Sequence, residues 1–131
     1  MRNMQHCDRV LVAAAFALLL STSLPASSVA AEVAADAKVE TAGERAHFAQ
    51  AFCGVSAERV DGYKQQLKKT LHDPAGFDRY WQVGWRRAES GISQMSALRE
   101  HDPAEFASRI KGNCGRLKWQ AENAVRPPAR K

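Results

Sequence analysis

The sequence predicts an all-α fold, a small antiparallel four-helix array of one short helix and three longer ones, closed by one disulfide. Three observations predict it. Apolar residues recur at steps of three and four through residues 41–124, which is the period of an amphipathic helix. No useful length of this region alternates apolar and polar residues, as a half-buried strand does. Helix-start and helix-stop residues divide it into four segments with short connections, which favour antiparallel neighbours.

The N-terminus has the pattern of a secretory signal peptide over residues 1–31. Arg2 and Arg9 precede an apolar run over residues 10–20, and small residues follow it, which predicts cleavage after Ala31. The run is 11 residues long, whereas a membrane span needs about 20. We therefore expect no transmembrane anchor, and a bacterial protein that is periplasmic or secreted.

The chain after the signal peptide divides into three parts. Residues 32–40 are rich in alanine and charge without a clear period, so we expect a flexible lead-in. The helical domain is expected over residues 41–124. Residues 125–131 (VRPPARK) are basic and contain two prolines, which predicts a disordered tail.

The first helix is expected to be short and the second to follow it closely. Thr41 and Glu44 have the spacing of a capping box, and Gly54 is suited to end the helix as a C-cap. Ser56 is placed to cap the second helix. The apolar positions of that second helix recur at helical spacing: Val60, Tyr63, Leu67 and Leu71.

The third and fourth helices are each preceded by the same pattern, HDPAxF, at residues 72–77 and 101–106. In both copies we expect Asp to cap the helix and Pro to take its first position, where a missing N–H costs no hydrogen bond. Within the third helix, Gly84, Ala88 and Gly91 form a strip of small residues. Another helix can approach closely over such a strip.

Two cysteines, Cys53 and Cys114, remain once the signal peptide, with Cys7, is removed. An even number of cysteines in an exported chain predicts one disulfide. In the chain-entropy model such a bond contributes about 4 kcal/mol. The alternative is a pair of free thiols that bind a metal, which the sequence does not favour because it lacks CxxC and CxxCH motifs.

Two surfaces are candidates for binding. Tyr80, Trp85 and Arg86 lie in the densest aromatic cluster, and these residue types are favoured anchors in protein interfaces. The alternative is that the rings cover the core, and the exposure of Trp85 separates the two interpretations. Lys111 and Lys118 belong to the second surface, the basic fourth helix.

The positive charge of the chain is concentrated at its C-terminal end. From Arg109 onward seven basic residues stand against one acidic residue, Glu122, whereas residues 32–108 carry a net charge of −2. Such a segment attracts an acidic protein or an anionic component of the envelope. We expect no nucleic-acid partner, because the chain is exported and carries no groove-reading motif.

The sequence contains no catalytic motif that would indicate an enzyme. In class alone, the chain resembles small helical proteins of the bacterial periplasm, among them chaperone-like stress proteins and inhibitors that protect against toxins. We therefore expect a non-catalytic, cofactor-free protein that binds another envelope protein or an anionic envelope component. The alternative is a metal- or haem-binding bundle that uses His47, Met95, His72 or His101.

Overall fold

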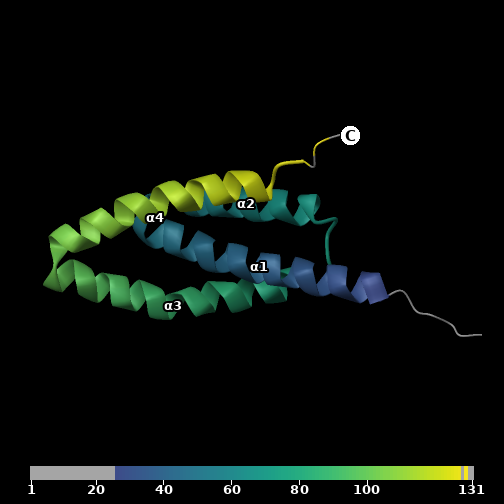
Figure 1. The fold of residues 1–131 in the computed structure, drawn as a ribbon, viewed down its shortest axis with the longest axis horizontal. Coiled ribbons are helices and arrows are strands. Elements are labelled where there is room, and N and C mark those ends of the chain that lie inside the picture. Colours follow the sequence, from purple (N-terminus) through teal and green to yellow (C-terminus); the bar gives the residue numbers. More distant parts are fainter. Residues whose placement is uncertain (1–25, 128, 130–131) are drawn as a thin grey trace, which may run out of the picture.

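The computed structural model of the protein describes residues 26–127 and residue 129, which form four helices. Figure 1 shows α3 and α4 meeting at a sharp turn and diverging from it, while α1 contacts both. The predicted all-α fold and the Cys53–Cys114 disulfide are confirmed. The helices are α1 (Ala26–Phe52), α2 (Ala57–Thr70), α3 (Phe77–His101) and α4 (Pro103–Ala124).

Helix α1 begins earlier than the sequence pattern indicates. It is 27 residues long, so the expectation of a short first helix is wrong, and the short helix is α2, with 14 residues. Residues 32–40, expected to be a flexible lead-in, are helical, and Val39 is fully buried. Thr41 lies inside the helix and donates to the carbonyl oxygen of Ala37 instead of capping. Alanine favours helix strongly but leaves no apolar period in the sequence.

The residues before Ala26 lie outside the described part of the chain, and with them most of the predicted signal peptide. Helix α1 begins ahead of the predicted cleavage point at Ala31, and cleavage there stays a prediction. At the other end, α4 ends at Ala124 as expected, and Val125 packs against the core.

Helices α1 and α3 pack backbone against backbone at two glycines. A Cβ atom added to Gly84 would collide with the carbonyl oxygen of Glu40, and one added to Gly43 would collide with a carbonyl oxygen of α3. The predicted strip for close approach is confirmed at Gly84 and Ala88, which are both buried. A Cβ atom at Gly91 would meet nothing within 4 Å, so the close contact ends before that residue.

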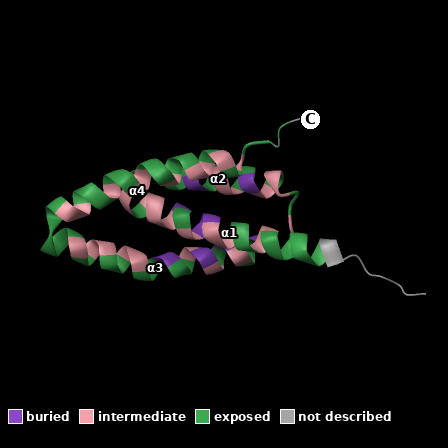
Figure 2. Ribbon diagram, in the orientation of Figure 1, coloured by how far each residue is buried: buried purple, intermediate pink, exposed green. Residues whose placement is uncertain are grey.

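The buried core lies between α1, α2 and α3, and α4 contributes no buried residue to it. Figure 2 shows this difference as purple segments on the first three helices and only pink and green along α4. Helix α4 is attached to the rest of the fold by the disulfide, near the middle of the helix, and by the Phe106 ring, whose centroid lies 5.7 Å from that of Phe52. The core residues are Val39, Ala42, Ala46, Val60, Leu67, Phe77 and Trp81.

Three of the predicted helix boundaries are confirmed. Gly54, the second residue after α1, has a φ of 66°, a conformation that glycine adopts without steric cost. The Ser56 hydroxyl accepts a hydrogen bond from the backbone of Arg59 and caps α2. In the second copy of HDPAxF, the Asp102 carboxylate accepts from the backbone N–H of Glu105 at 3.0 Å and caps α4.

The first copy of HDPAxF does not cap a helix, so that prediction is wrong. Asp73 has a φ of 53° and donates its backbone N–H to the carbonyl oxygen of Lys68, which closes the end of α2. The carboxylate of Asp73 also lies 3.4 Å from the Lys68 ammonium. Because these contacts use Asp73 to end α2, α3 begins later, at Phe77 after the left-handed Gly76.

Asp78, in the first turn of α3, joins this helix to α2 through two ion pairs. Its carboxylate lies 2.7 Å from the Lys64 ammonium and 3.3 Å from that of Lys68. Hydrogen bonding by Lys64, and then by Lys68, holds the pKa of Asp78 below its usual value. A carboxylate with a lowered folded-state pKa stabilises the fold above its unfolded pKa, and this contribution is lost as the pH falls through the folded value.

We expect Asp78→Asn to lower the free energy of unfolding by less than about 1 kcal/mol near neutral pH, since the Asp78 carboxylate is exposed. The difference from the wild type should shrink below about pH 4 and vanish once both proteins are uncharged at this position. Urea unfolding at several pH values measures it, with Asp61→Asn, on the exposed surface of α2, as the control. A difference that grows towards acid pH would contradict the prediction.

Candidate functional site

The aromatic candidates of α3 lie against the core. Tyr80 and Trp85 are half-buried and pack on the core cluster, whereas Arg86 is exposed. The guanidinium of Arg79 lies 4.6 Å from the centre of the Tyr80 ring and donates to its hydroxyl at 2.8 Å. These contacts favour the interpretation in which the rings cover the core.

Trp85 is further engaged by His47 of α1. The two rings are stacked with centroids 4.2 Å apart and an interplanar angle of 5°. The Nδ1 atom of His47 lies 2.7 Å from the carbonyl oxygen of Trp85. Because a carbonyl only accepts, Nδ1 carries the proton, and His47 links α1 to α3 through both its ring face and this hydrogen bond.

The histidines do not gather into a metal centre in the part of the chain that the structure describes. Residues 26–127 and 129 contain no group of three or more His, Cys, Asp or Glu side chains able to hold a metal ion. His72 and His101 are exposed at the ends of α2 and α3, and Met95 is half-buried within α3.

The two predicted lysines of α4 lie on its outer face, which we define as Lys111, Gly112, Gly115, Lys118 and Trp119. At 3.6 residues per turn these five positions share an arc of about 120°, which also contains the exposed Glu122, and the half-buried apolar residues of α4 lie on the opposite side. All five are exposed, and the side chain of Trp119 is 65% exposed. A Cβ atom at either glycine would meet nothing within 4 Å.

Trp119 is the residue that sequence reasoning misses. Two positions after Leu117, it falls well away from the apolar stripe of α4, and a large aromatic ring on the polar side of an amphipathic helix is the feature that marks it. Exposed large apolar side chains that stand near charged ones are typical of interaction sites.

The positive charge of the outer face is not neutralised within the described structure. Lys111 and Lys118 form no ion pair with any described residue, while Arg109, further round α4, pairs with Glu105 at 2.6 Å. The two lysines are one heptad apart and therefore stand on the same side of the helix, beside Trp119. The face combines one exposed ring with two ammonium groups that form no ion pair with a described residue, and with Glu122 on the same arc it keeps a net charge of +1.

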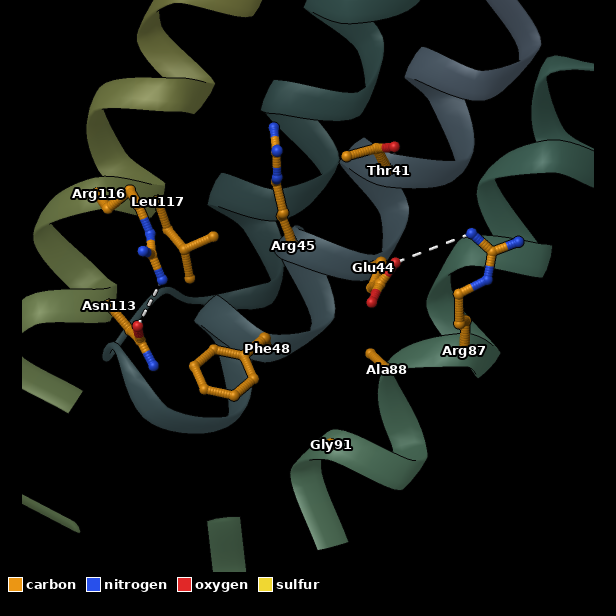
Figure 3. A pocket seen from close by; sticks show the side chains of 10 residues that line it. All are labelled: Thr41, Glu44, Arg45, Phe48, Arg87, Ala88, Gly91, Asn113, Arg116 and Leu117. Atoms are coloured by element: carbon orange, nitrogen blue, oxygen red, sulfur yellow. Dashed lines mark hydrogen bonds and ion pairs between the residues drawn. The ribbon is translucent and has the colours of Figure 1, made fainter. Parts of the chain in front are cut away.

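A groove of about 360 Å³ lies between α1, α3 and α4 and opens to solvent. Figure 3 shows its polar side chains arriving from all three helices, with Arg87 directed at Glu44 and Arg116 at Asn113. Phe48, Ala88, Gly91 and Leu117 give it an apolar lining. Sequence analysis does not find this groove, since its residues come from three separate segments of the chain.

A second hollow, of about 310 Å³, lies between α1, α2 and α3. Trp81 and Trp85 line it together with Asp61 and Lys64. Trp85, one of the predicted binding residues, therefore reaches the surface at this hollow. Lys64 lies 5.7 Å from the centre of the Trp81 ring and is also paired with Asp78, so its positive charge is already compensated within the protein.

None of the helices in the described part of the chain is both long enough and apolar enough to cross a membrane. Comparison of the chain with protein-family models, with curated proteins and with solved structures gives no match.

Proposed function

We propose that the protein is a non-catalytic binding protein of the bacterial cell envelope, whose outer face of α4 docks an acidic amphipathic helix of another envelope protein. The observation that carries the proposal is the 65% exposure of Trp119 beside unpaired lysines. It is supported by the position of this ring on a helix that buries none of its residues.

The chemistry of the face favours a helix with carboxylates along its edges. A tryptophan is among the most frequent anchors of protein interfaces. Lys111 and Lys118 lie on one side of Trp119, where their ammonium groups would attract carboxylates of a partner helix and repel a basic one. Gly112 and Gly115 have no side chains, so a partner helix can approach the backbone of α4 closely.

A second copy of this chain fits the face poorly. Pairing two α4 helices through their outer faces would bring together two copies of Lys111 and Lys118, within a segment whose only acidic residue after Arg109 is Glu122. Like charges placed together at an interface cost free energy. An acidic partner removes this repulsion, and we therefore assign the face to a different protein.

Location in the envelope is supported by two sequence features. The N-terminal pattern is typical of an exported protein. The disulfide fits the same compartment, because such bonds persist in oxidising environments and are rare in the cytosol.

The proposal is tested with a labelled helical peptide that carries leucines on one side and glutamates on its flanks. Fluorescence anisotropy should show saturable binding to the wild type, weakened at least tenfold by Trp119→Ala. Lys111→Gln/Lys118→Gln should weaken binding and reduce its salt dependence. The matched control is Lys38→Gln/Lys69→Gln, which removes two exposed charges from α1 and α2.

Three results would overturn the proposal. The first is equal affinity of the wild type and Trp119→Ala for the acidic peptide, and the second is equal binding of a peptide with lysines in place of its glutamates. The third is binding to vesicles of anionic phospholipid with no binding to the peptide, which would assign the face to a membrane surface. Far-UV circular dichroism confirms that each variant is folded.

A further inference from the structure

The groove between α1, α3 and α4 has the composition of a ligand site, and it does not include the outer face of α4. We propose that it binds a small amphiphilic anion, with an apolar body on the groove lining and an acidic head group at Arg45 and Arg116. Its volume of about 360 Å³ is at the lower end of the range of about 300–1,000 Å³ for ligand pockets. A small molecule therefore fits it better than a protein segment.

The charges at the groove are unequally satisfied. Arg87 is neutralised, since its guanidinium lies 2.6 Å from the carboxylate of Glu40 and 3.9 Å from that of Glu44. Arg116 donates to the amide oxygen of Asn113 at 2.7 Å, which leaves its charge uncompensated. Arg45 forms no ion pair with a described residue.

Two guanidinium groups that form no ion pair with a described residue thus come from different helices to line one groove. Arg45 comes from α1 and Arg116 from α4, and Figure 3 shows both above Phe48. Guanidinium groups bind carboxylates and phosphates through charge-assisted hydrogen bonds. An anion bound at these two residues would neutralise positive charge that no described carboxylate of the protein pairs with.

Away from the arginines, the lining of the groove is apolar. Phe48 and Leu117 are half-buried, and Ala88 is buried. Gly91 adds space, because no atom lies within 4 Å of the position of a Cβ atom there. The ligand class that matches both parts has a hydrocarbon body and a single acidic group, either a carboxylate or a phosphate monoester.

The test is an NMR titration of the ¹⁵N-labelled protein with decanoate, decyl phosphate, 1-decanol and acetate, each below its aggregation or solubility limit. Decanoate or decyl phosphate should give saturable shifts at the amides of Phe48, Gly91 and Leu117. The stronger of the two identifies the head group. Decanol and acetate, which lack the charge or the body, should bind at least tenfold more weakly.

Two variants test the two halves of the site separately. Arg45→Gln/Arg116→Gln should weaken binding of the anion at least tenfold and leave the affinity for decanol unchanged. Gly91→Leu should abolish both by filling the groove. Arg59→Gln/Lys69→Gln, which removes two exposed charges from α2, is the matched control.

The inference fails if decanol binds as tightly as decanoate, if the shifts map to the hollow beside Trp81, or if no ligand gives saturable shifts. It also fails if the control variant weakens binding as much as Arg45→Gln/Arg116→Gln does. If Gly91→Leu does not fold, the arginine variant decides alone. None of these outcomes depends on peptide binding at Trp119.

Discussion

Gly84→Ala is expected to destabilise the protein by about 3 kcal/mol or more. Overpacking a core usually costs about 1–3 kcal/mol because side chains move to make room. Here the obstacle is the carbonyl oxygen of Glu40, which belongs to the backbone of α1 and cannot rotate away. The two helices must separate, and their separation also disturbs the stacking of His47 on Trp85.

Gly91→Ala is the matched control, since it places the same methyl group two turns further along α3. No atom lies within 4 Å of that position. Replacing glycine by alanine inside a helix gains up to about 1 kcal/mol when nothing collides. We therefore expect this variant to be as stable as the wild type or slightly more stable.

Urea unfolding followed by circular dichroism measures both variants, and Gly43→Ala should behave like Gly84→Ala because it faces a carbonyl oxygen of α3. If Gly84→Ala and Gly91→Ala are equally stable, the register of α1 against α3 described above is wrong. A loss at Gly84 alone, with Gly43→Ala unaffected, would place the close contact at one end of the interface only.

The pairing of α1 with α3 could be predicted only in part from the sequence. The strip at Gly84 and Ala88 is visible in the sequence, because small residues at helical spacing indicate a close helix neighbour. The neighbour itself is not visible, since residues 32–40 are mostly alanine and charge and show no apolar face. Val39 is buried in the core between α1, α2 and α3, and this burial is a property of the assembled fold.

The repeated HDPAxF pattern shows the same limit in local structure. Asp102 caps α4 as expected, whereas Asp73 ends α2. The difference comes from what precedes each copy: Lys68, one turn before Asp73, supplies both a backbone carbonyl and an ammonium partner. Identical side chains therefore take different roles according to the end of the preceding helix.

Of the two candidate sites, one is indicated by the sequence and the other is not. Lys111 and Lys118 could be proposed from the sequence because the charge of α4 is a property of one segment, and their role in binding stays a prediction. The groove could not, because Arg45 and Arg116 meet only after α1 and α4 are placed together. A charge pattern is local in sequence, whereas a concave site depends on tertiary structure.

Removing the Cys53–Cys114 disulfide is expected to release α4 before the rest of the fold. The bond is attached near the middle of α4, and this helix contributes no buried residue. Its other contacts with the fold include those of Phe106 with Phe52 and Arg99, and Val125, directly after the helix, packs on the core. With a separation of 61 residues, the bond contributes about 4 kcal/mol in the chain-entropy model.

The variant Cys53→Ala/Cys114→Ala should therefore melt about 20 °C lower than the oxidised wild type. Hydrogen exchange should show the loss of amide protection in α4 first, with α1 and α3 retaining theirs at low denaturant. An equal loss in all of these helices would contradict the prediction, because it would make α4 part of one cooperative unit. If α4 is released, the groove loses Asn113, Arg116 and Leu117, and binding of decanoate should be lost with them.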